Sequence, residues 1–398
     1  MTILPRMLQP ITATLRMGYP AILVTGPRQS GKTTFARAAF PGLPYVNLES
    51  PLERSELHDD PVGFFARFSE GAVLDEIQNV PEALSYLQVM IDEDTRRGLW
   101  VLTGSQQLGL NREVSQSLAG RVARLELLPF SLAELEPAQS RPTSLAEAVL
   151  VGGYPPLHDS DRQLEPTRWL EDYLATFVNR DIRSILAVRD RHTFDRFLRL
   201  CAAHTGQVFE AARLARDIGV DSKTVMSWIS VLEACYLVRL VHPHHRNFGK
   251  RITKRPKLYF LDSGLACRLL HIADVNQLRH HPLWGALVET WCATEVLKAR
   301  LNRARPANLW FWRSSDGYEI DLIIEGSNSL CPIEVKANST PFQKHGATIT
   351  KLRSLSEKHD SSVISPGFIV YGGDERRPCG PDQFVPWDLI DQEIGAVR

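Results

Sequence analysis

One short segment constrains the fold more than any other: AILVTGPRQSGKTT, residues 21–34. An apolar, β-prone run leads into a loop that contains Gly26 and Gly31, and the helix-forming residues TTFARAAF follow directly. This is the order of strand, glycine-rich loop and helix that a P-loop requires. The glycines let backbone N–H groups turn toward phosphate oxygens, and the helix N-terminus adds a partial positive charge. The segment therefore predicts a nucleotide-binding α/β core.

The residues of this loop have separate expected roles. Lys32 is expected to reach the β and γ phosphates of ATP, and the Thr33 hydroxyl is expected to bind Mg²⁺. The other residues expected to contact the nucleotide are Gly26, Gln29, Ser30, Gly31 and Thr34.

Acidic residues follow at the position where a P-loop protein needs them. The segment GAVLDEIQ, residues 71–78, reads as an apolar strand that ends in Asp75 and Glu76. Asp75 is expected to hold Mg²⁺ through water, and Glu76 to orient and polarise the attacking water. A later strand, GLWVLTGSQQ, presents Ser105 and Gln106 at its tip, and either of these can contact the γ-phosphate.

An arginine is expected to stabilise the transferring phosphoryl group. The segment SLAGRVARLELLPFSLAEL, residues 117–135, predicts a turn, then a strand through Val122 and Leu125, then a helix. Arg121 or Arg124 is the candidate, acting across a subunit boundary in a homo-oligomer. The alternative is a solvated surface arginine.

Length and composition set the outer limits. A chain of 398 residues with 43% apolar residues predicts two or three globular domains. The N-terminus has no basic segment followed by an apolar one, and no run approaches the ~18 apolar residues of a membrane span. We therefore expect a cytoplasmic protein with no membrane partner. The six cysteines are far apart and are expected to be buried thiols, and the formal charge of zero leaves nucleic-acid binding to local patches.

The middle of the chain predicts a helical connector and a helix-turn-helix. Residues 139–205 form the expected connector, and residues 206–255 the expected winged helix-turn-helix. Its second helix should begin after Asp221 and present its polar side chains outward. These are Ser222, Lys223, Thr224 and Ser227, and the expected basic wing carries Arg246, Lys250, Arg251, Lys254, Arg255 and Lys257. Such a cluster favours salt-sensitive nucleic-acid binding, although winged helices also act as protein–protein spacers.

The C-terminal part predicts a helix followed by three strands. The helix covers residues 281–301 and includes Glu289, and the strand candidates are NLWFWRS, YEIDLIIEG and CPIEVKA. Period-two alternation places Glu319, Asp321 and Ile323 on one face of the second strand, and Glu334 with Lys336 on one face of the third. If these strands pair, Asp321 and Glu334 converge on one metal ion beside Lys336, which suits metal-assisted phosphodiester hydrolysis. A surface ion pair is the alternative.

Several of these motifs together are similar to those of a known family. The chain resembles bacterial ATP-binding proteins of the AAA superfamily whose second half is a domain of unknown function. The shared segments are GPRQSGKTT, VNLES (46–50), LDEIQ (74–78), LTGSQ (102–106), SLAGR (117–121), GGYP (152–155) and RDI (180–182). The resemblance implies an ATPase core with nucleotide at Lys32, Thr33, Asp75 and Glu76.

The C-terminal strands resemble the PD-(D/E)xK restriction-endonuclease-like superfamily. This resemblance implies that Asp321 is the strand acid, that Glu334 and Lys336 form the ExK pair, and that Glu289 is the helix acid. It implies a site for Mg²⁺ or Mn²⁺ bound by Glu289, Asp321 and Glu334. Ile320 occupies a position where the signature often has proline.

The sequence as a whole predicts an α/β protein in several parts. They are a P-loop AAA-type ATPase core (1–138), a helical connector (139–205), a winged helix (206–255) and a restriction-endonuclease-like domain (256–398). One hypothesis is an ATPase coupled to a metal-dependent nuclease acting on nucleic acid, DNA more than RNA. The other is an ATP-driven switch or scaffold whose C-terminal domain only binds nucleic acid or a protein. An ion pair from Lys336 that closes the acidic pocket would favour the second.

Overall fold

The computed structural model describes residues 4–105, 118–138, 141–182, 190–244, 254–314, 316–358 and 363–397. The chain forms two compact units. The first consists of Met1–Phe130 with Ala234–Tyr236 and Leu301–Arg305, and the second of Ser131–Glu233, Leu237–Arg300 and Pro306–Arg398. Among the helices of the described ranges, none is both long and apolar enough to cross a membrane.

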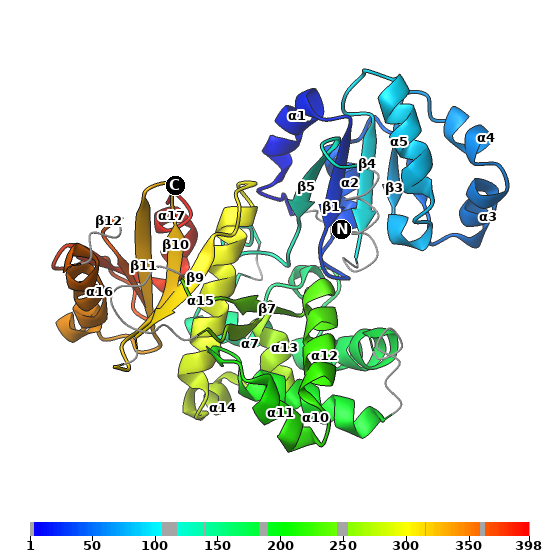
Figure 1. The fold of residues 1–398 in the computed structure, drawn as a ribbon. Coiled ribbons are helices and arrows are strands. Elements are labelled where there is room, and N and C mark those ends of the chain that lie inside the picture. The colour runs from blue at the N-terminus through cyan, green and yellow to red at the C-terminus, as the bar shows by residue number, and fades with distance from the viewer. Residues whose placement is uncertain are drawn as a thin grey trace. The chain divides into compact units, whose positions relative to one another are not determined.

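The first unit is built on a parallel sheet of five strands, drawn in blue to teal in Figure 1. The strand order is β2-β3-β4-β1-β5, and each neighbouring pair is parallel. The bounds are β1 (Ala21–Thr25), β2 (Tyr45–Asn47), β3 (Ala72–Asp75), β4 (Trp100–Gly104) and β5 (Val122–Glu126). Since all strands run in one direction, the loops that follow β1, β3 and β4 meet at one edge of the sheet, where ligands of open α/β sheets bind.

Helices cover both faces of this sheet because its strands are apolar on both sides. Ala21 and Leu23 pack in one hydrophobic cluster with residues of α3 (Pro51–Asp59), α4 (Pro61–Ala66) and α5 (Ala83–Glu93). Ile22 and Val24 pack in the other cluster with residues of α1 (Gln9–Gly18) and α2 (Lys32–Ala39). A parallel sheet buried on both faces confirms the α/β class predicted for this part.

The helix predicted at the end of residues 117–135 is wrong. Residues 132–137 form turns instead. The side chains of Ser131 and Glu134 accept hydrogen bonds from each other's backbone N–H groups, and the N–H of Leu132 donates to the carboxylate of Glu295 at 2.8 Å. These side-chain bonds compete with a helical ladder and hold the segment in turns.

The second unit begins with helices, as predicted for the connector. They are α7 (Leu145–Val151), the 3₁₀ turn η2 (Pro155–His158), α8 (Pro166–Tyr173), the π-helix η3 (Leu174–Ile182) and α10 (Arg191–Ala203). The segment GGYP serves this packing: Gly152 has a φ of +73°, and a Cβ there would lie 2.3 Å from Oδ1 of buried Asp262. The N–H of Gly153 donates to Asp262 at 2.8 Å.

Two helices lie in the region of the predicted helix-turn-helix, and the second begins where it was expected. Helix α11 (Ala211–Ile218) ends at Gly219, whose φ is +77°, and α12 (Ser222–Ala234) begins after Asp221. The carboxylate of Asp221 accepts the Thr224 N–H at 2.9 Å, which caps α12. A small antiparallel sheet accompanies these helices in the order β6-β8-β7, formed by β6 (Gln207–Val208), β7 (Val238–Val241) and β8 (Lys257–Phe260).

The C-terminal part contains a mixed sheet, drawn in yellow to red in Figure 1. Its order is β14-β15-β13-β11-β10-β9, with β12 beside β11. Strands β9, β10 and β11 are antiparallel neighbours, whereas β11, β13 and β15 run parallel. The bounds are α13 (Ser263–Leu269), α14 (Val275–His280), α15 (Trp284–Leu301), β9 (Leu309–Arg313), β10 (Glu319–Glu325), β11 (Ser329–Lys336), η4 (Gln343–Gly346), α16 (Ala347–Lys358), β12 (Val363–Ile364), β13 (Phe368–Tyr371), β14 (Arg377–Cys379), β15 (Asp382–Pro386), η5 (Trp387–Leu389) and α17 (Ile390–Glu393). The three predicted strands and the helix predicted before them are confirmed.

A bulge in β10 changes one predicted orientation. The register between β9 and β10 shifts between Ile320 and Ile323. Both isoleucines pack in the same buried cluster as Ile349 and Leu352 of α16. The prediction that Ile323 shares a face with Glu319 and Asp321 is therefore wrong, because the extra residue of a bulge breaks period-two alternation.

Candidate functional site

The glycine loop after β1 has the backbone that its sequence requires. Gly31 has a φ of +88°, in the region that side-chain-bearing residues rarely occupy. A Cβ at Gly26 would lie 2.1 Å from the carbonyl oxygen of Leu127, so this position has room for glycine alone. The hydroxyl of Ser30 in this loop is buried and has no hydrogen-bond partner among the described residues. Gln29 and Thr34 are exposed.

Lys32 is enclosed by the loop. It is 4% exposed, and its ammonium donates to the carbonyl oxygen of Pro27 at 2.8 Å. Burial lowers the pKa of Lys32 to about 8, against the opposing pull of the Glu76 and Asp75 carboxylates. The ammonium therefore lies within the loop at the end where β1 stops, as expected for a group that meets phosphates.

Asp75 is the centre of a group of hydroxyls. Thr33 donates to its Oδ2 at 2.8 Å, and Tyr45 donates to the same oxygen at 2.5 Å. Thr103 donates to Oδ1. Burial, with the Asp75 carboxylate beside it, raises the pKa of Tyr45, so its hydroxyl stays protonated as a donor. Tyr45 and Thr103 were not predicted; the only signal was that Thr103 lies in the strand that precedes Ser105.

Glu76 is held in place by neighbours from two segments. Its φ is +59°, and its N–H donates to Thr103 Oγ1 at 3.0 Å. Its carboxylate oxygen Oε2 accepts from the hydroxyl of Ser105 at 3.0 Å and from the amide of Gln78. Ser105 is fully buried. The bond of Ser105 to Glu76 was not predicted and Gln78 was missed, while the contact of Ser105 with a phosphate stays a prediction.

The residues at this edge suit a nucleotide with a hard divalent cation. The Thr33 hydroxyl and the Asp75 carboxylate, 2.8 Å apart, are the oxygen donors that Mg²⁺ prefers. Lys32 and the unpartnered hydroxyl of Ser30 lie in the adjoining loop. Thr33 and Asp75 would hold the metal and the loop would hold the phosphates.

Arg121 lies at the opposite end of the same sheet, where the strands begin. It directly precedes β5, and its carbonyl accepts the N–H of Ala21, the first residue of β1. Its guanidinium binds Asp92 of α5 through two bonds of 2.6 and 2.8 Å. Arg121 is therefore far from the loop after β1 in its own chain, and a role across a subunit boundary stays a prediction. Gln106 and Ser117 lie outside the described residues.

The outward orientation predicted for α12 is confirmed. Ser222, Lys223 and Ser227 are exposed, Thr224 is partly exposed, and Val225 and Ile229 are buried. Of the predicted basic wing, Arg246, Lys250 and Arg251 lie outside the described residues. Lys254 is exposed and Arg255 pairs with Glu210 at 2.9 Å.

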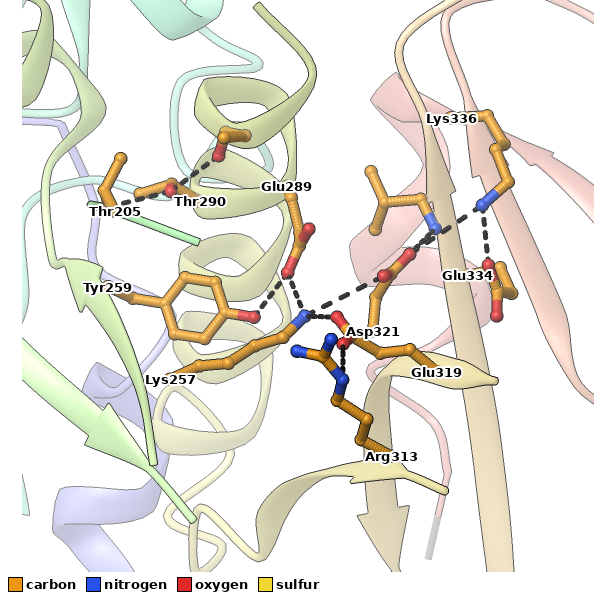
Figure 2. A network of polar contacts seen from close by, with 12 residues as sticks. Thr205, Lys257, Tyr259, Glu289, Thr290, Arg313, Glu319, Asp321, Glu334 and Lys336 are labelled. Atoms are coloured by element: carbon orange, nitrogen blue, oxygen red, sulfur yellow. Dashed lines mark hydrogen bonds and ion pairs between the residues drawn. The ribbon is translucent and has the colours of Figure 1, made fainter. Parts of the chain in front are cut away.

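Lys257 is the clear error among these predictions. It does not belong to a basic surface: it is 1% exposed and lies in β8. Figure 2 shows its ammonium between three carboxylates. Its Nζ lies 2.8 Å from Glu289 Oε1, 2.6 Å from Glu319 Oε1 and 3.9 Å from Asp321 Oδ1. Tyr259, two residues further along β8, donates to Glu289 Oε1 at 2.6 Å.

The predicted D…ExK residues converge as expected from the hairpin. Strands β10 and β11 pair with Leu322 opposite Ile333, which brings Asp321 and Glu334 to neighbouring positions. Asp321 Oδ2 accepts the N–H of Val335 at 2.8 Å and lies 3.9 Å from Lys336 Nζ. The Lys336 ammonium donates to Glu334 Oε2 at 2.6 Å (Figure 2). The other oxygen, Glu334 Oε1, is buried without a partner in the described chain.

Burial changes the acidity of two of these carboxyls. Desolvation raises the pKa of Glu334 to about 8, with the Asp321 charge acting in the same direction and Lys336 opposing it. Desolvation also raises the pKa of Glu289 to about 7, opposed by Lys257. Both groups have an acidity far from that of a solvated carboxyl, which is typical of functional sites and of buried ion-pair networks alike.

The predicted three-carboxylate metal site is not assembled here. No three His, Cys, Asp or Glu side chains in the described ranges form a group that could hold a metal ion. The physical reason is visible in the contacts: Glu289 is bound by Lys257 and Tyr259, and Glu334 is bound by Lys336. The six cysteines are free and buried, as predicted.

Family models cover most of the chain. An AAA domain matches residues 18–136, and two domains of unknown function, DUF8612 and DUF4143, match residues 142–276 and 284–390. The first unit thus carries an AAA-type ATPase domain, a class that generally uses ATP with Mg²⁺.

Relatives and solved structures are similar over long stretches. The uncharacterized proteins Rv2008c of Mycobacterium tuberculosis and Mb2031c of Mycobacterium bovis are each 31% identical over an alignment of 393 residues, and the alignment covers 95% of this chain and 84% of theirs. Among solved structures, the Walker-type ATPase paby2304 of Pyrococcus abyssi aligns with a TM-score of 0.46 at 16% identity, over 67% of this chain and 96% of that chain.

Proposed function

The chain belongs to the same family as the mycobacterial protein Rv2008c, and on that premise we propose that it is an ATP-hydrolysing switch. Its ATPase domain binds and hydrolyses ATP, and its second unit binds duplex nucleic acid, DNA in preference to RNA, without cutting it. The observation that carries the ATPase proposal is the contact of Thr33 with Asp75 beside the buried Lys32.

The residues of the loop act on the phosphates. Backbone N–H groups around Gly31 and the N-terminus of α2 bind phosphate oxygens, and Lys32 exchanges the carbonyl of Pro27 for the β and γ phosphates. Thr33 and Asp75 would hold Mg²⁺, which would supply charge neutralisation at the phosphates. Ser30, with its buried unpartnered hydroxyl, is a further donor for the nucleotide.

Glu76 is the group that orients and polarises water. Its carboxylate accepts from Ser105 and Gln78, which fixes the direction in which the remaining oxygen faces. We propose that these two bonds position Glu76 for a water at the γ-phosphate, so that proton transfer and attack are aligned.

Two substitutions test the ATPase. Lys32→Ala should abolish ATP hydrolysis, because the phosphates lose their cation. Glu76→Gln should retain ATP binding but slow turnover by about 10²-fold or more, the usual contribution of a positioned base. The measurement is steady-state phosphate release together with binding of a fluorescent ATP analogue, with Lys344→Ala at an exposed lysine as the control. Unchanged turnover in Lys32→Ala would refute the assignment.

The middle of the second unit supports the proposed contact with nucleic acid. The elements α10, β6, α11, α12, β7 and β8 follow in the order of a winged helix, and β8 pairs with both β6 and β7. Helix α12 presents Lys223 outward, and α11 presents Arg213 and Arg216, all three exposed. Exposed cations on adjacent helices are suited to phosphate contacts.

The C-terminal part is proposed to have the restriction-endonuclease-like fold without cleavage activity. The order of α15, β9, β10, β11, α16 and β13, with acids at Glu289, Asp321 and Glu334, supports that fold. The ion pair of Lys336 with Glu334 and the enclosure of Lys257 among the other acids favour binding over cutting.

A metal-dependent nuclease is the second candidate. Convergence of Asp321, Glu334 and Lys336 favours it, since these are the groups that phosphodiester hydrolysis uses. Incubation of labelled DNA and RNA with Mg²⁺ or Mn²⁺ decides between the two. Cutting that disappears in Asp321→Ala would establish the nuclease and overturn the proposal of binding alone.

A further inference from the structure

The ammonium of Lys257 lies inside a buried acidic cluster. The cluster consists of Glu289 on α15 with Glu319 and Asp321 on β10, and the ammonium of Lys257 enters it from β8 (Figure 2). Its Nζ lies 2.6 and 2.8 Å from two carboxylate oxygens that belong to different elements. Lys257 is 1% exposed. With two short contacts and Asp321 at 3.9 Å, its ammonium is a buried counter-ion for three acids.

The occupied oxygens limit what else can bind. Divalent cations need carboxylate oxygens at about 2.0–2.6 Å, and an ammonium at the same oxygens excludes them by size and by charge repulsion. The charges are also nearly balanced: Glu289, Glu319, Asp321 and Glu334 face Lys257 and Lys336, with Arg313 3.5 Å from Glu319. A cluster that carries its own cations has little net charge left to attract a metal.

We propose that Lys257 is a built-in substitute for the divalent metal, so that the C-terminal part of this chain is assembled and works without a metal at this cluster. The inference rests on the proposed function, in which that part binds nucleic acid without cutting it. It adds that the metal is excluded by the side chain of Lys257 from β8, while the acids themselves are retained.

Strand pairing fixes the backbone position from which Lys257 enters the cluster. Lys257 is paired in β8 with Val208 of β6 on one side and with Val241 of β7 on the other. Tyr259 lies on the same strand and binds the same oxygen of Glu289. Withdrawal of the ammonium would require the Lys257 side chain to change rotamer and to lose its short contacts with Glu289 and Glu319.

The first test compares metal binding in the wild type and in Asp321→Asn, both free of nucleotide. Asparagine can still accept the N–H of Val335, so the hairpin should remain folded. We expect Mn²⁺ titrations followed by electron paramagnetic resonance to be the same for the two proteins, within about twofold. A wild-type Mn²⁺ site that Asp321→Asn removes would overturn the proposal.

The second test removes the internal cation. Among the described residues these three acids are not arranged as a metal site while Lys257 lies between them. We expect them to close on one Mn²⁺ ion in Lys257→Met, a site that Lys257→Met with Asp321→Asn lacks. The melting temperature of Lys257→Met should rise by about 5 °C when Mn²⁺ is present at 100 times its Kd, whereas that of the wild type should not change. Lys254→Met, an exposed lysine three residues earlier, is the matched control. A folded Lys257→Met protein that gains no Mn²⁺ would contradict the proposal.

These measurements are independent of the proposed function. They use neither ATP nor nucleic acid, so failure of Lys32→Ala to stop hydrolysis would leave them unaffected. If DNA is cut by a protein whose cluster binds no Mn²⁺, the proposed function fails while the inference about Lys257 holds. If Mn²⁺ binds at Asp321 and no nucleic acid is cut, the inference fails while the proposed function holds.

Discussion

At the scale of single residues, the burial of Lys32 determines how nucleotide binding should depend on pH. The side chain is 4% exposed, and desolvation lowers the pKa of its ammonium to about 8. The charged form is the one that attracts phosphates, and it is lost as pH rises through this pKa. The nucleotide must then supply the energy of reprotonation.

We therefore predict that affinity for a non-hydrolysable ATP analogue falls above pH 8 by about tenfold per pH unit, since one proton is taken up on binding. The measurement is Kd at constant Mg²⁺ between about pH 6.5 and 9.5. Lys344→Ala should follow the same curve. Affinity that stays constant over this range would show that Lys32 keeps its proton in the free protein.

At the scale of elements, α11 and α12 carry the contact proposed with nucleic acid. Val225, Trp228 and Ile229 bury one side of α12, which leaves Lys223 and Ser227 on the other. On α11, Leu214 and Ile218 are buried while Arg213 and Arg216 are exposed. Both helices thus direct cations away from their shared core.

We predict that Arg213→Glu with Arg216→Glu lowers the affinity for duplex DNA at least tenfold and reduces the slope of log Kd against log salt by about 0.9 per lost phosphate contact. Fluorescence anisotropy at several salt concentrations measures both quantities. Lys344→Glu with Lys358→Glu, at two exposed lysines of η4 and α16, makes the same charge change elsewhere and should have little effect. Equal losses in both variants would indicate a general effect of charge, and binding of a protein but not of DNA would favour the spacer role.

At the scale of the whole molecule, the position of Arg121 makes an oligomer necessary if this residue acts in catalysis. It lies at the edge of the sheet where the strands begin, whereas Lys32 and Asp75 lie where they end. The guanidinium of Arg121 can therefore reach only the nucleotide of another subunit, and it must first break its ion pair with Asp92.

We predict that Arg121→Ala lowers ATP turnover by about 10³-fold. Mixing it with Glu76→Gln subunits should restore activity, because each Arg121→Ala site then receives an arginine from its neighbour. Asp92→Ala, which frees Arg121 in place, is the matched control and should remain active. Turnover in Arg121→Ala equal to the wild type would transfer the role to Arg124, and an inactive mixture would exclude action between subunits.

The sequence by itself determined the features that are local or repeat at short range. The glycine loop, the acids Asp75 and Glu76, and the start of α12 after Asp221 could be predicted because each depends on neighbouring residues. Period-two alternation likewise predicted that Glu334 and Lys336 share a face, and their 2.6 Å contact bears this out.

Only the tertiary structure decided the partners of these groups. Lys257 reads as one cation in a basic run, yet strand pairing buries it among Glu289, Glu319 and Asp321. The period-two alternation of side chains failed at Ile323 because of a bulge that no residue type in the strand predicts. Local pattern fixes which way a side chain faces, whereas its partner depends on how distant segments pack. In this protein that packing placed the ammonium of Lys257 beside Glu289 and Asp321, two of the three acids for which the sequence predicted a metal.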